Sequence, residues 1–267
     1  MNLLVTGCSG GVGRHIRRDA EIDFRNFQNN NSHSDLKALS NGSTLIHLAA
    51  ITSIQQVQDD PDKSFNVNVS STIDLFRAFA TNGGRRFIFT STGHVYGKTP
   101  SGSLSSEMDP LNPLSLYAEQ KMLAESKLLQ EAENSEVELI ILRVFSIFGK
   151  GMKSHFLAGR IETEFKYSGN FPKIINADDV RDFSSPIQVA YLIEKSAKIP
   201  ISRSLTLNIC TGRGTTVREI VMSNFPNIDN ESFVAGNSET PRLVGNPKNK
   251  NIFFKDNQLK TRFQNSN

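Results

Sequence analysis

The chain has 267 residues, of which 37% are hydrophobic and 21% charged, so it can bury one large core or a core and a smaller lobe. Lys and Arg number 30 and Asp and Glu 27, and the resulting net charge of +3 excludes a nucleic-acid binder that relies on bulk positive charge. The two cysteines, Cys8 and Cys210, argue against a disulfide scaffold and fit a reducing compartment.

Neither a metal site nor a membrane segment is indicated. No Cys/His group has the spacing of zinc ligands, and no apolar run reaches the ~18 residues that a bilayer requires. We therefore expect a cytoplasmic protein with no metal, no membrane partner and no nucleic-acid partner.

Short apolar runs alternate with amphipathic stretches along the first part of the chain. The runs at 3–5, 44–48, 86–90 and 139–144 are typical of strands that are covered on both faces. Between them, apolar residues at steps of three and four predict a helix over 62–80, and a second helix is expected over 115–133 with Ser115 as its N-cap. This alternation predicts an α/β fold with a doubly wound parallel sheet.

A glycine-rich loop follows the first expected strand. Gly7, Gly10 and Gly13 recur at three-residue steps, where a tight turn and a close backbone approach to a pyrophosphate require residues without Cβ. We expect the loop to open a helix whose N–H groups hold the diphosphate, with Gly11 and Val12 also at the cofactor. The pattern predicts a dinucleotide, NAD or NADP.

The segment from Gly13 to His47 is short for such a fold, and a strand or most of a helix is missing from it. It should carry the residue that meets the adenosine ribose of the cofactor. Asp23 there favours NAD, whereas Arg14, Arg17 or Arg25 would favour NADP, and the choice stays open.

Tyr117 and Lys121 lie four residues apart on one expected helix, so their side chains leave the same face. The strand at 86–90 continues into the hydroxyls of residues 90–92, at the strand end where ligands bind in such sheets. An ammonium group and an oxidised nicotinamide would lower the pKa of a phenol from ~10. Tyr117 could then take a proton from a substrate hydroxyl, or return it in the reverse reaction.

Six segments in order resemble extended short-chain dehydrogenases/reductases of the NAD-dependent epimerase/dehydratase type, which act on nucleotide sugars. They are TGCSGGVG at 6–13, HLAA at 47–50, FTSTGHVYG at 89–97, YAEQK at 117–121, LRVFSIFG at 142–149 and RDF at 181–183. The resemblance covers nearly the whole chain. It implies a Rossmann-like sheet with a smaller C-terminal substrate lobe.

The resemblance also implies roles for single residues. Thr92, Tyr117 and Lys121 would be catalytic, with Ser91 a weaker candidate than Thr92, and Lys121 would also bind the nicotinamide ribose. Asn68 matches an Asn in the helix under the site, for which a packing role is equally compatible. The cofactor would contact Ala49, Ala50 and Thr90, and the substrate Thr92, Gly93, His94, Ser146, Arg181 and Arg242.

Several positions depart from the family pattern. Gly93 and His94 stand where dehydratases carry an acidic pair, which argues against a 4,6-dehydratase. Ser146 replaces a frequent Asn, and Lys150 replaces the usual Pro. His47 and His94 are interpreted as a strand-end residue and a variable loop residue rather than as metal ligands.

We expect residues 1–149 to form the dinucleotide-binding domain, with 186–210 returning to it as a helix and a strand. Residues 150–185 and 211–267 would form the smaller substrate-binding lobe. The favoured function is reduction of a 4-keto nucleotide sugar. A C4 epimerase with retained NAD and a non-catalytic dinucleotide sensor or scaffold are the alternatives, and a homodimer through helices 62–80 and 115–133 is plausible.

Overall fold

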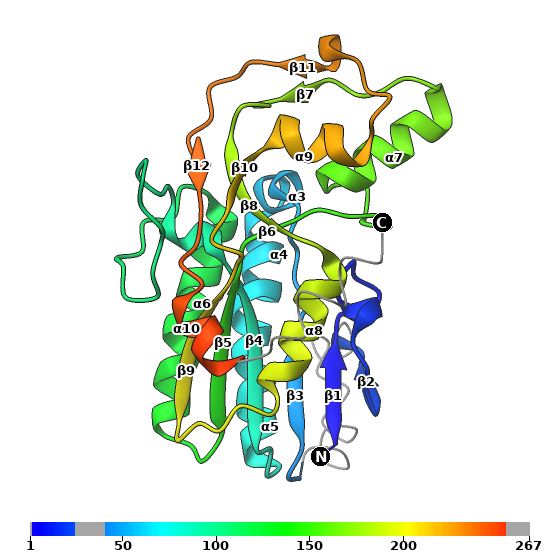
Figure 1. Ribbon diagram of the computed structural model, residues 1–267. Coiled ribbons are helices and arrows are strands. Elements are labelled where there is room, and N and C mark those ends of the chain that lie inside the picture. Colours follow the sequence, from blue (N-terminus) through cyan, green and yellow to red (C-terminus); the bar gives the residue numbers. More distant parts are fainter. Residues whose placement is uncertain (1, 25–40, 255–267) are drawn as a thin grey trace.

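A six-stranded parallel sheet forms the centre of the molecule in the computed structural model, which describes residues 2–24 and 41–254 (Figure 1). Its strand order is β2-β1-β3-β4-β5-β9, and every neighbouring pair is parallel. The doubly wound parallel sheet predicted from the sequence is confirmed. The strands are β1 (Leu3–Thr6), β2 (Ala20–Ile22), β3 (Thr44–His47), β4 (Arg86–Thr92), β5 (Glu138–Val144) and β9 (Ser204–Ile209).

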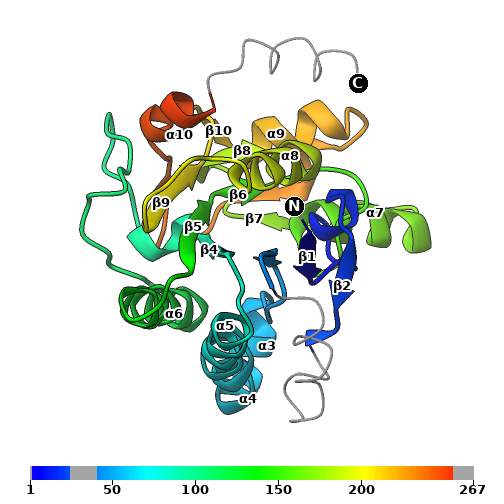
Figure 2. The ribbon, with the colours of Figure 1, turned by 90° about the horizontal axis from the view of Figure 1, so that it is seen from below.

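Helices cover both faces of this sheet (Figure 2). One face packs against α5 (Ser71–Thr81) and α6 (Leu116–Glu133), and Phe87 and Phe89 of β4 are fully buried there. The other face packs against α8 (Pro186–Ser196), where Ile88 is fully buried. The uninterrupted apolar runs of the strands follow from this double cover.

The helix expected over 62–80 is interrupted. It consists of α4 (Pro61–Phe65), a π-helical turn η2 (Asn66–Ser70) and α5, and the short α3 (Ile54–Asp59) precedes it. The helix expected over 115–133 is present as α6, and the Ser115 hydroxyl accepts from Ala118 N at 3.3 Å as its N-cap.

The helix expected after the glycine loop is absent, which corrects the prediction from the motif. Gly13–His15 form a single 3-10 turn, η1, and the chain then turns back to begin β2 at Ala20. Asp19 secures the return, because its N–H donates to Leu3 O at 2.9 Å and its carboxylate accepts from Leu3 N at 2.7 Å. The few residues between η1 and β2 leave no room for a helix and a return strand.

A smaller group of strands and helices lies beyond the carboxyl ends of the large sheet (Figure 1). There β8 pairs with β6, β10 and β12, and β7 pairs with β11. Contrary to the expected boundary, α10 (Lys248–Phe253) belongs with the large sheet, since Phe254 packs into the same core as α8. The remaining bounds are η3 (Gly93–Tyr96), β6 (Ser146–Ile147), α7 (Leu157–Ser168), β7 (Ile174–Ile175), β8 (Val180–Ser184), β10 (Gly214–Thr216), α9 (Val217–Asn224), η4 (Asn230–Ser232), β11 (Phe233–Val234) and β12 (Arg242–Leu243).

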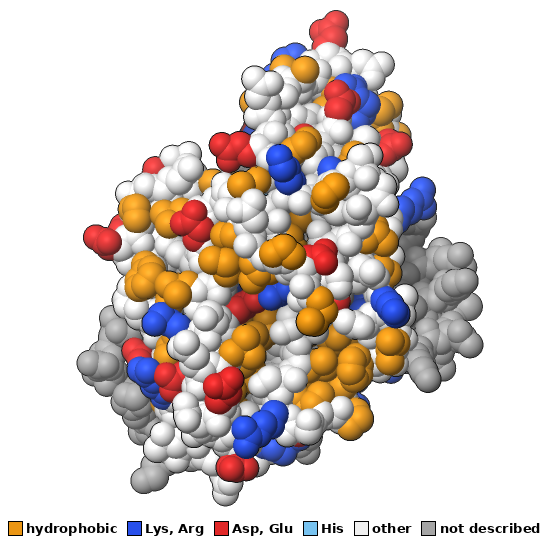
Figure 3. All heavy atoms as spheres, turned by 90° about the vertical axis from the view of Figure 1, so that its left-hand side faces the viewer, with side chains coloured by type: hydrophobic (Ala, Val, Ile, Leu, Met, Phe, Trp, Pro, Cys, Tyr) orange, Lys and Arg blue, Asp and Glu red, His pale blue; other side chains and the backbone are white. Residues whose placement is uncertain are grey.

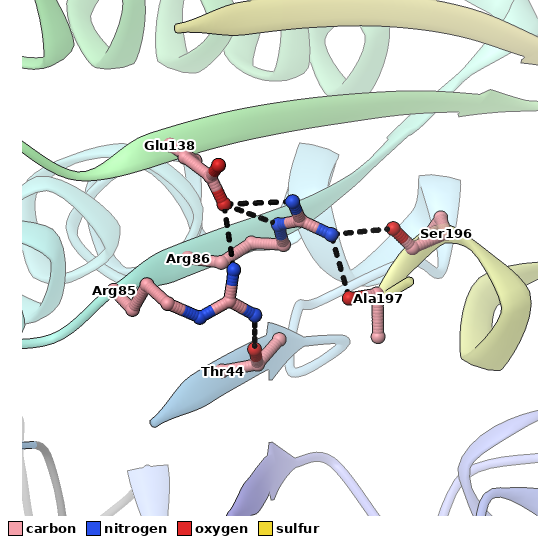
Figure 4. A network of polar contacts seen from close by, with 6 residues as sticks. All are labelled: Thr44, Arg85, Arg86, Glu138, Ser196 and Ala197. Carbon is pink, nitrogen blue, oxygen red and sulfur yellow. Dashed lines mark hydrogen bonds and ion pairs between the residues drawn. The ribbon is translucent and has the colours of Figure 1, made fainter. Parts of the chain in front are cut away.

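A buried ion pair ties the amino ends of the strands together (Figure 4). The Arg86 guanidinium donates to Glu138 Oε2 from Nε at 2.8 Å and lies 2.7 Å from it through Nη2. Arg86 Nη1 also donates to the carbonyls of Ser196 and Ala197 at the end of α8. This network joins β4, β5 and α8 at the edge of the sheet opposite the candidate site.

Within the described ranges, no helix is both long and apolar enough to cross a membrane. The described side chains also include no group of three or more His, Cys, Asp or Glu residues that could hold a metal ion.

Candidate active site

A cavity of about 1550 Å³ opens at the carboxyl ends of β1 to β5. It lies where the chain order reverses between β1 and β3, the switch point at which doubly wound sheets bind ligands. Its volume exceeds the roughly 300–1,000 Å³ typical of a pocket for one small ligand, so there is room for a dinucleotide and a second molecule.

The glycine loop forms one wall of this cavity. Gly7 has a positive φ of 76°, and a Cβ there would lie 2.7 Å from Ala49 N. A Cβ on Gly13 would collide with the Gly7 carbonyl oxygen. These positions therefore require glycine, and the bare backbone between them, with Gly10, Gly11 and Val12, faces the cavity. The cradle fits a diphosphate, although one 3-10 turn replaces the helix expected behind it.

Asp23 follows β2 directly and lines the same cavity, as does Glu21. This strand end is the position at which an acidic residue meets the ribose hydroxyls of a dinucleotide. Of the three arginines that would favour NADP, Arg14 donates from Nε to Gly10 O at 3.3 Å and Arg17 pairs with Glu194 at 3.4 Å. Arg25, the third, lies outside the described residues.

Tyr117 and Lys121 both face the cavity from the first turns of α6. Lys121 is 2% exposed, and its Nζ lies over the ring of Phe89, 3.9 Å from the centroid. Burial lowers the pKa of Lys121 to about 7, and the Glu125 carboxylate opposes part of that shift. Burial raises the pKa of Tyr117 above that of a free phenol, so the hydroxyl is protonated at neutral pH.

The three hydroxyls at the end of β4 line the cavity but differ in their bonding. Thr90 Oγ1 donates to His47 O at 2.8 Å, and Thr92 Oγ1 accepts from His94 N at 3.2 Å. Because Thr92 accepts in this bond, its own proton is available for a substrate oxygen. Ser91 Oγ is buried and has no hydrogen-bond partner among the described residues.

Buried polar side chains hold the loop that follows β3. Asn68 accepts from Ile51 N at 2.9 Å and donates to Ile51 O and to Gln120 of α6. His47 is held between the hydroxyls of Thr6 at 2.8 Å and Thr72 at 3.0 Å. Burial lowers the pKa of His47 to about 3. Both side chains have satisfied structural roles, and they position Ala49 and Ala50 at the cavity wall.

Three of the expected substrate contacts, His94, Ser146 and Arg181, line the cavity. Arg181 Nη2 lies 2.8 Å from Asp179 Oδ2, which holds the guanidinium in place. Burial, with a smaller contribution from the Arg181 charge, lowers the pKa of His94 to about 4, so this imidazole is neutral at pH 7.

Two expected substrate contacts are not part of the cavity wall. Gly93 is buried, and a Cβ there would lie 2.9 Å from the Phe145 ring, which separates this position from the cavity. The Arg242 guanidinium donates to the carbonyls of Pro100 at 3.2 Å and Ser103 at 2.9 Å, so it secures a surface loop instead. Neither residue is among the described residues that line the cavity.

The sequence analysis missed the segment 152–156, which lines the cavity from the side of the smaller lobe. A Cβ on Gly11 would meet the Met152 sulfur, and Thr52 Oγ1 lies 3.2 Å from His155 Nε2. Lys153 and Phe156 also line the cavity. Periodicity could not predict this role, because the segment has neither the helical nor the strand spacing of apolar residues.

The chain is similar to a family of known proteins. Residues 3–184 match the profile of the NAD dependent epimerase/dehydratase family. The chain is 28% identical to a GDP-6-deoxy-D-mannose reductase of Pseudomonas aeruginosa, covering 82% of this chain and 77% of the relative. It is 30% identical to a UDP-glucose 4-epimerase of Mycolicibacterium smegmatis, covering 66% of this chain and 57% of the relative.

Solved structures share the fold. MoeE5 in complex with UDP-glucuronic acid and NAD superposes with a TM-score of 0.81 at 22% identity, over 96% of this chain and 93% of that one. RMD from Pseudomonas aeruginosa complexed with NADPH superposes with a TM-score of 0.79 at 21% identity, over 96% and 93%. With a family match over more than half of its length, the chain belongs to the NAD-dependent epimerase/dehydratase family.

Proposed function

We propose that the protein is an NAD(P)-dependent oxidoreductase that reduces the 4-keto group of a nucleotide-activated sugar. The observation that carries the proposal is that Tyr117 and Lys121 line the same cavity as the glycine loop that fits a diphosphate. Reduction needs an acid that is protonated at neutral pH. A phenol with its ordinary pKa of ~10 meets this need, and burial raises the pKa of Tyr117 further.

In this mechanism Gly7, Gly10 and Gly13 would hold the cofactor diphosphate, and Asp23 the adenosine ribose. When bound, the reduced nicotinamide supplies the hydride for the carbonyl carbon. Thr92 donates a hydrogen bond to the carbonyl oxygen, and Tyr117 transfers its proton to that oxygen as it becomes an alcohol. Lys121 stabilises the phenolate that remains, and Arg181 would bind the substrate diphosphate.

Two observations separate this reaction from others of the family. Water loss requires an acidic pair after Thr92, but this chain has Gly93 and His94 there. A side chain at Gly93 would meet the Phe145 ring, so the loop is not built for a carboxylate at this point. Similarity to the GDP-6-deoxy-D-mannose reductase over most of both chains is compatible with the reductase, although a UDP-glucose 4-epimerase of Rhizobium leguminosarum also matches over 91% of both chains.

A C4 epimerase with retained NAD is the second candidate, supported by the 30% identity to a UDP-glucose 4-epimerase. The two functions differ in whether the cofactor leaves. The deciding experiment purifies the protein without added cofactor, denatures it and identifies any released nucleotide by mass. Release of one NAD(H) per chain would refute the reductase. An empty protein that oxidises NADH or NADPH only when a 4-keto nucleotide sugar is added would support it.

We also propose a homodimer through α6. Leu116 and Leu123, one heptad apart on α6, are each 36% exposed, and Leu129 is 37% exposed. Hydrophobic side chains gather in several groups on the side of the molecule that carries α6 (Figure 3). Light scattering of the wild type and of Leu123→Lys tests this proposal. The wild type should have the mass of two chains and the variant that of one.

A further inference from the structure

The Ser91 hydroxyl is a buried polar group that takes no part in the proposed reaction. The residue is 5% exposed, and Oγ has no partner within the described part of the chain. Burying a hydroxyl without a hydrogen bond is unfavourable, because its hydration is lost and nothing replaces it. The neighbouring strand does not relieve it. Arg143 is opposite Ser91 in the β4–β5 register, but its guanidinium bonds Glu125 and Tyr96.

Strand geometry directs Ser91 toward α6. Side chains alternate along β4, so Ser91 leaves the same face as Phe89 and the opposite face from Thr92. The Lys121 ammonium lies over the Phe89 ring on that face, 3.9 Å from its centroid. Ser91, Tyr117 and Lys121 all line the same cavity. The Ser91 hydroxyl and the buried ammonium thus lie on the same face of the sheet and line the same cavity.

The Ser91 hydroxyl oxygen can accept a hydrogen bond from the Lys121 ammonium. An ammonium group has three donors, and none of them hydrogen-bonds to an acceptor among residues 2–24 and 41–254. The titratable groups around it are Tyr117 and Glu125 on its own helix, His47 on β3 and Arg143 on β5. His47 is neutral, and the Glu125 carboxylate is held by Arg143 at 2.8 Å, so neither bonds Lys121.

We propose that Ser91 is a positioning residue of the active site, whose hydroxyl, through an ordered water between the two groups, accepts from the Lys121 ammonium and holds it charged beside Tyr117. The role rests on the proposed function, because a charged Lys121 is what stabilises the Tyr117 phenolate. It is distinct from that of Thr92, which faces the substrate oxygen.

The test is a titration of Lys121 in the cofactor-free protein by the ¹³Cε chemical shift of labelled lysine, assigned by its loss in Lys121→Arg. The wild-type midpoint should lie near the pKa of about 7 that burial gives. Ser91→Ala should lower it by about one pH unit, because losing an acceptor disfavours the charged form. Ser91→Cys, of similar size, should shift it the same way, and Ser91→Thr should restore it.

Thermal stability separates positioning from packing. At pH 8, where Lys121 is mostly neutral, Ser91→Ala should melt near the wild-type temperature, because the hydroxyl that it removes has no direct partner among the described residues. Ser196→Ala is the matched control: Ser196 is 0% exposed, its Oγ donates to Ile193 O at 2.6 Å, and it lies outside the cavity. It should lower the melting temperature and leave the Lys121 midpoint unchanged.

Each outcome bears on a different claim. An unchanged Lys121 midpoint in both Ser91→Ala and Ser91→Cys overturns the role of Ser91. A lowered midpoint supports it, and in the loaded enzyme the alkaline limb of the kcat profile should move down by a similar amount, with KM little changed. If the midpoint shifts but the wild type reduces no 4-keto nucleotide sugar, the proposed function fails and the role of Ser91 stands.

Discussion

Cofactor binding should weaken as the pH rises through neutrality, because we propose that Lys121 binds the nicotinamide ribose. The ribose hydroxyls accept hydrogen bonds, so binding favours the charged ammonium and raises its pKa in the complex. With a pKa of about 7 in the free protein, Lys121 is about 0.9 protonated at pH 6, half at pH 7 and about 0.1 at pH 8. The Kd should therefore rise about tenfold between pH 6 and pH 8.

Isothermal titration calorimetry in two buffers of different ionisation enthalpy measures both the affinity and the protons taken up. Uptake should be about half a proton per site at pH 7 and near one at pH 8. NAD is the suitable ligand, because the phosphate monoester of NADP has a pKa of ~6 and its own protons would add to the measured uptake. Lys121→Met should bind with a Kd that does not change with pH. A constant Kd and no proton uptake in the wild type would refute this account of Lys121.

Three further results are expected. Tyr117→Phe should lower kcat about 10²–10⁴-fold in steady-state assays with the cofactor Kd unchanged, since only the proton donor is lost. Arg181→Ala should raise KM for the nucleotide sugar about tenfold, whereas Arg242→Ala should leave KM unchanged, and equal effects would contradict the placement of the two guanidinium groups. Glu138→Gln removes the carboxylate that pairs with the buried Arg86 and should reduce the free energy of unfolding by about 2–3 kcal/mol, or ~4–6 °C in Tm. Glu131→Gln, whose partner Arg77 is exposed, should change Tm by under ~2 °C.

The sequence predicted the sheet and the glycine cradle because both depend on local constraints. A short continuous apolar run is typical of a strand that is covered on both faces. Gly7 and Gly13 occupy positions that no side chain can take. The missing helix after Gly13 could not be predicted, since the motif fixes the turn but not the path after it. That path depends on the bonds of Asp19 to Leu3, which bring β2 alongside β1.

Residues outside the strands and the loop motif were harder to place. Tyr117 and Lys121 reach the cavity because α6 is regular, so helical spacing alone sets their common face. Arg242 begins the two-residue strand β12, and the segment 152–156 has no regular secondary structure, so the position of both depends on tertiary contacts that spacing does not encode. The Met152 contact with the glycine loop is one such contact, and it joins segments far apart in the sequence.

The protonation states of the site explain why its chemistry should begin only when ligands bind. At neutral pH the imidazoles of His47 and His94 are uncharged because they are buried, and burial leaves Lys121 about half protonated. Tyr117 keeps its proton, as an ordinary phenol does at this pH, and burial raises its pKa further. A bound ribose would complete the charge on Lys121, and a substrate carbonyl oxygen would accept the Tyr117 proton. The fold keeps the groups in place, and the ligands set their charge.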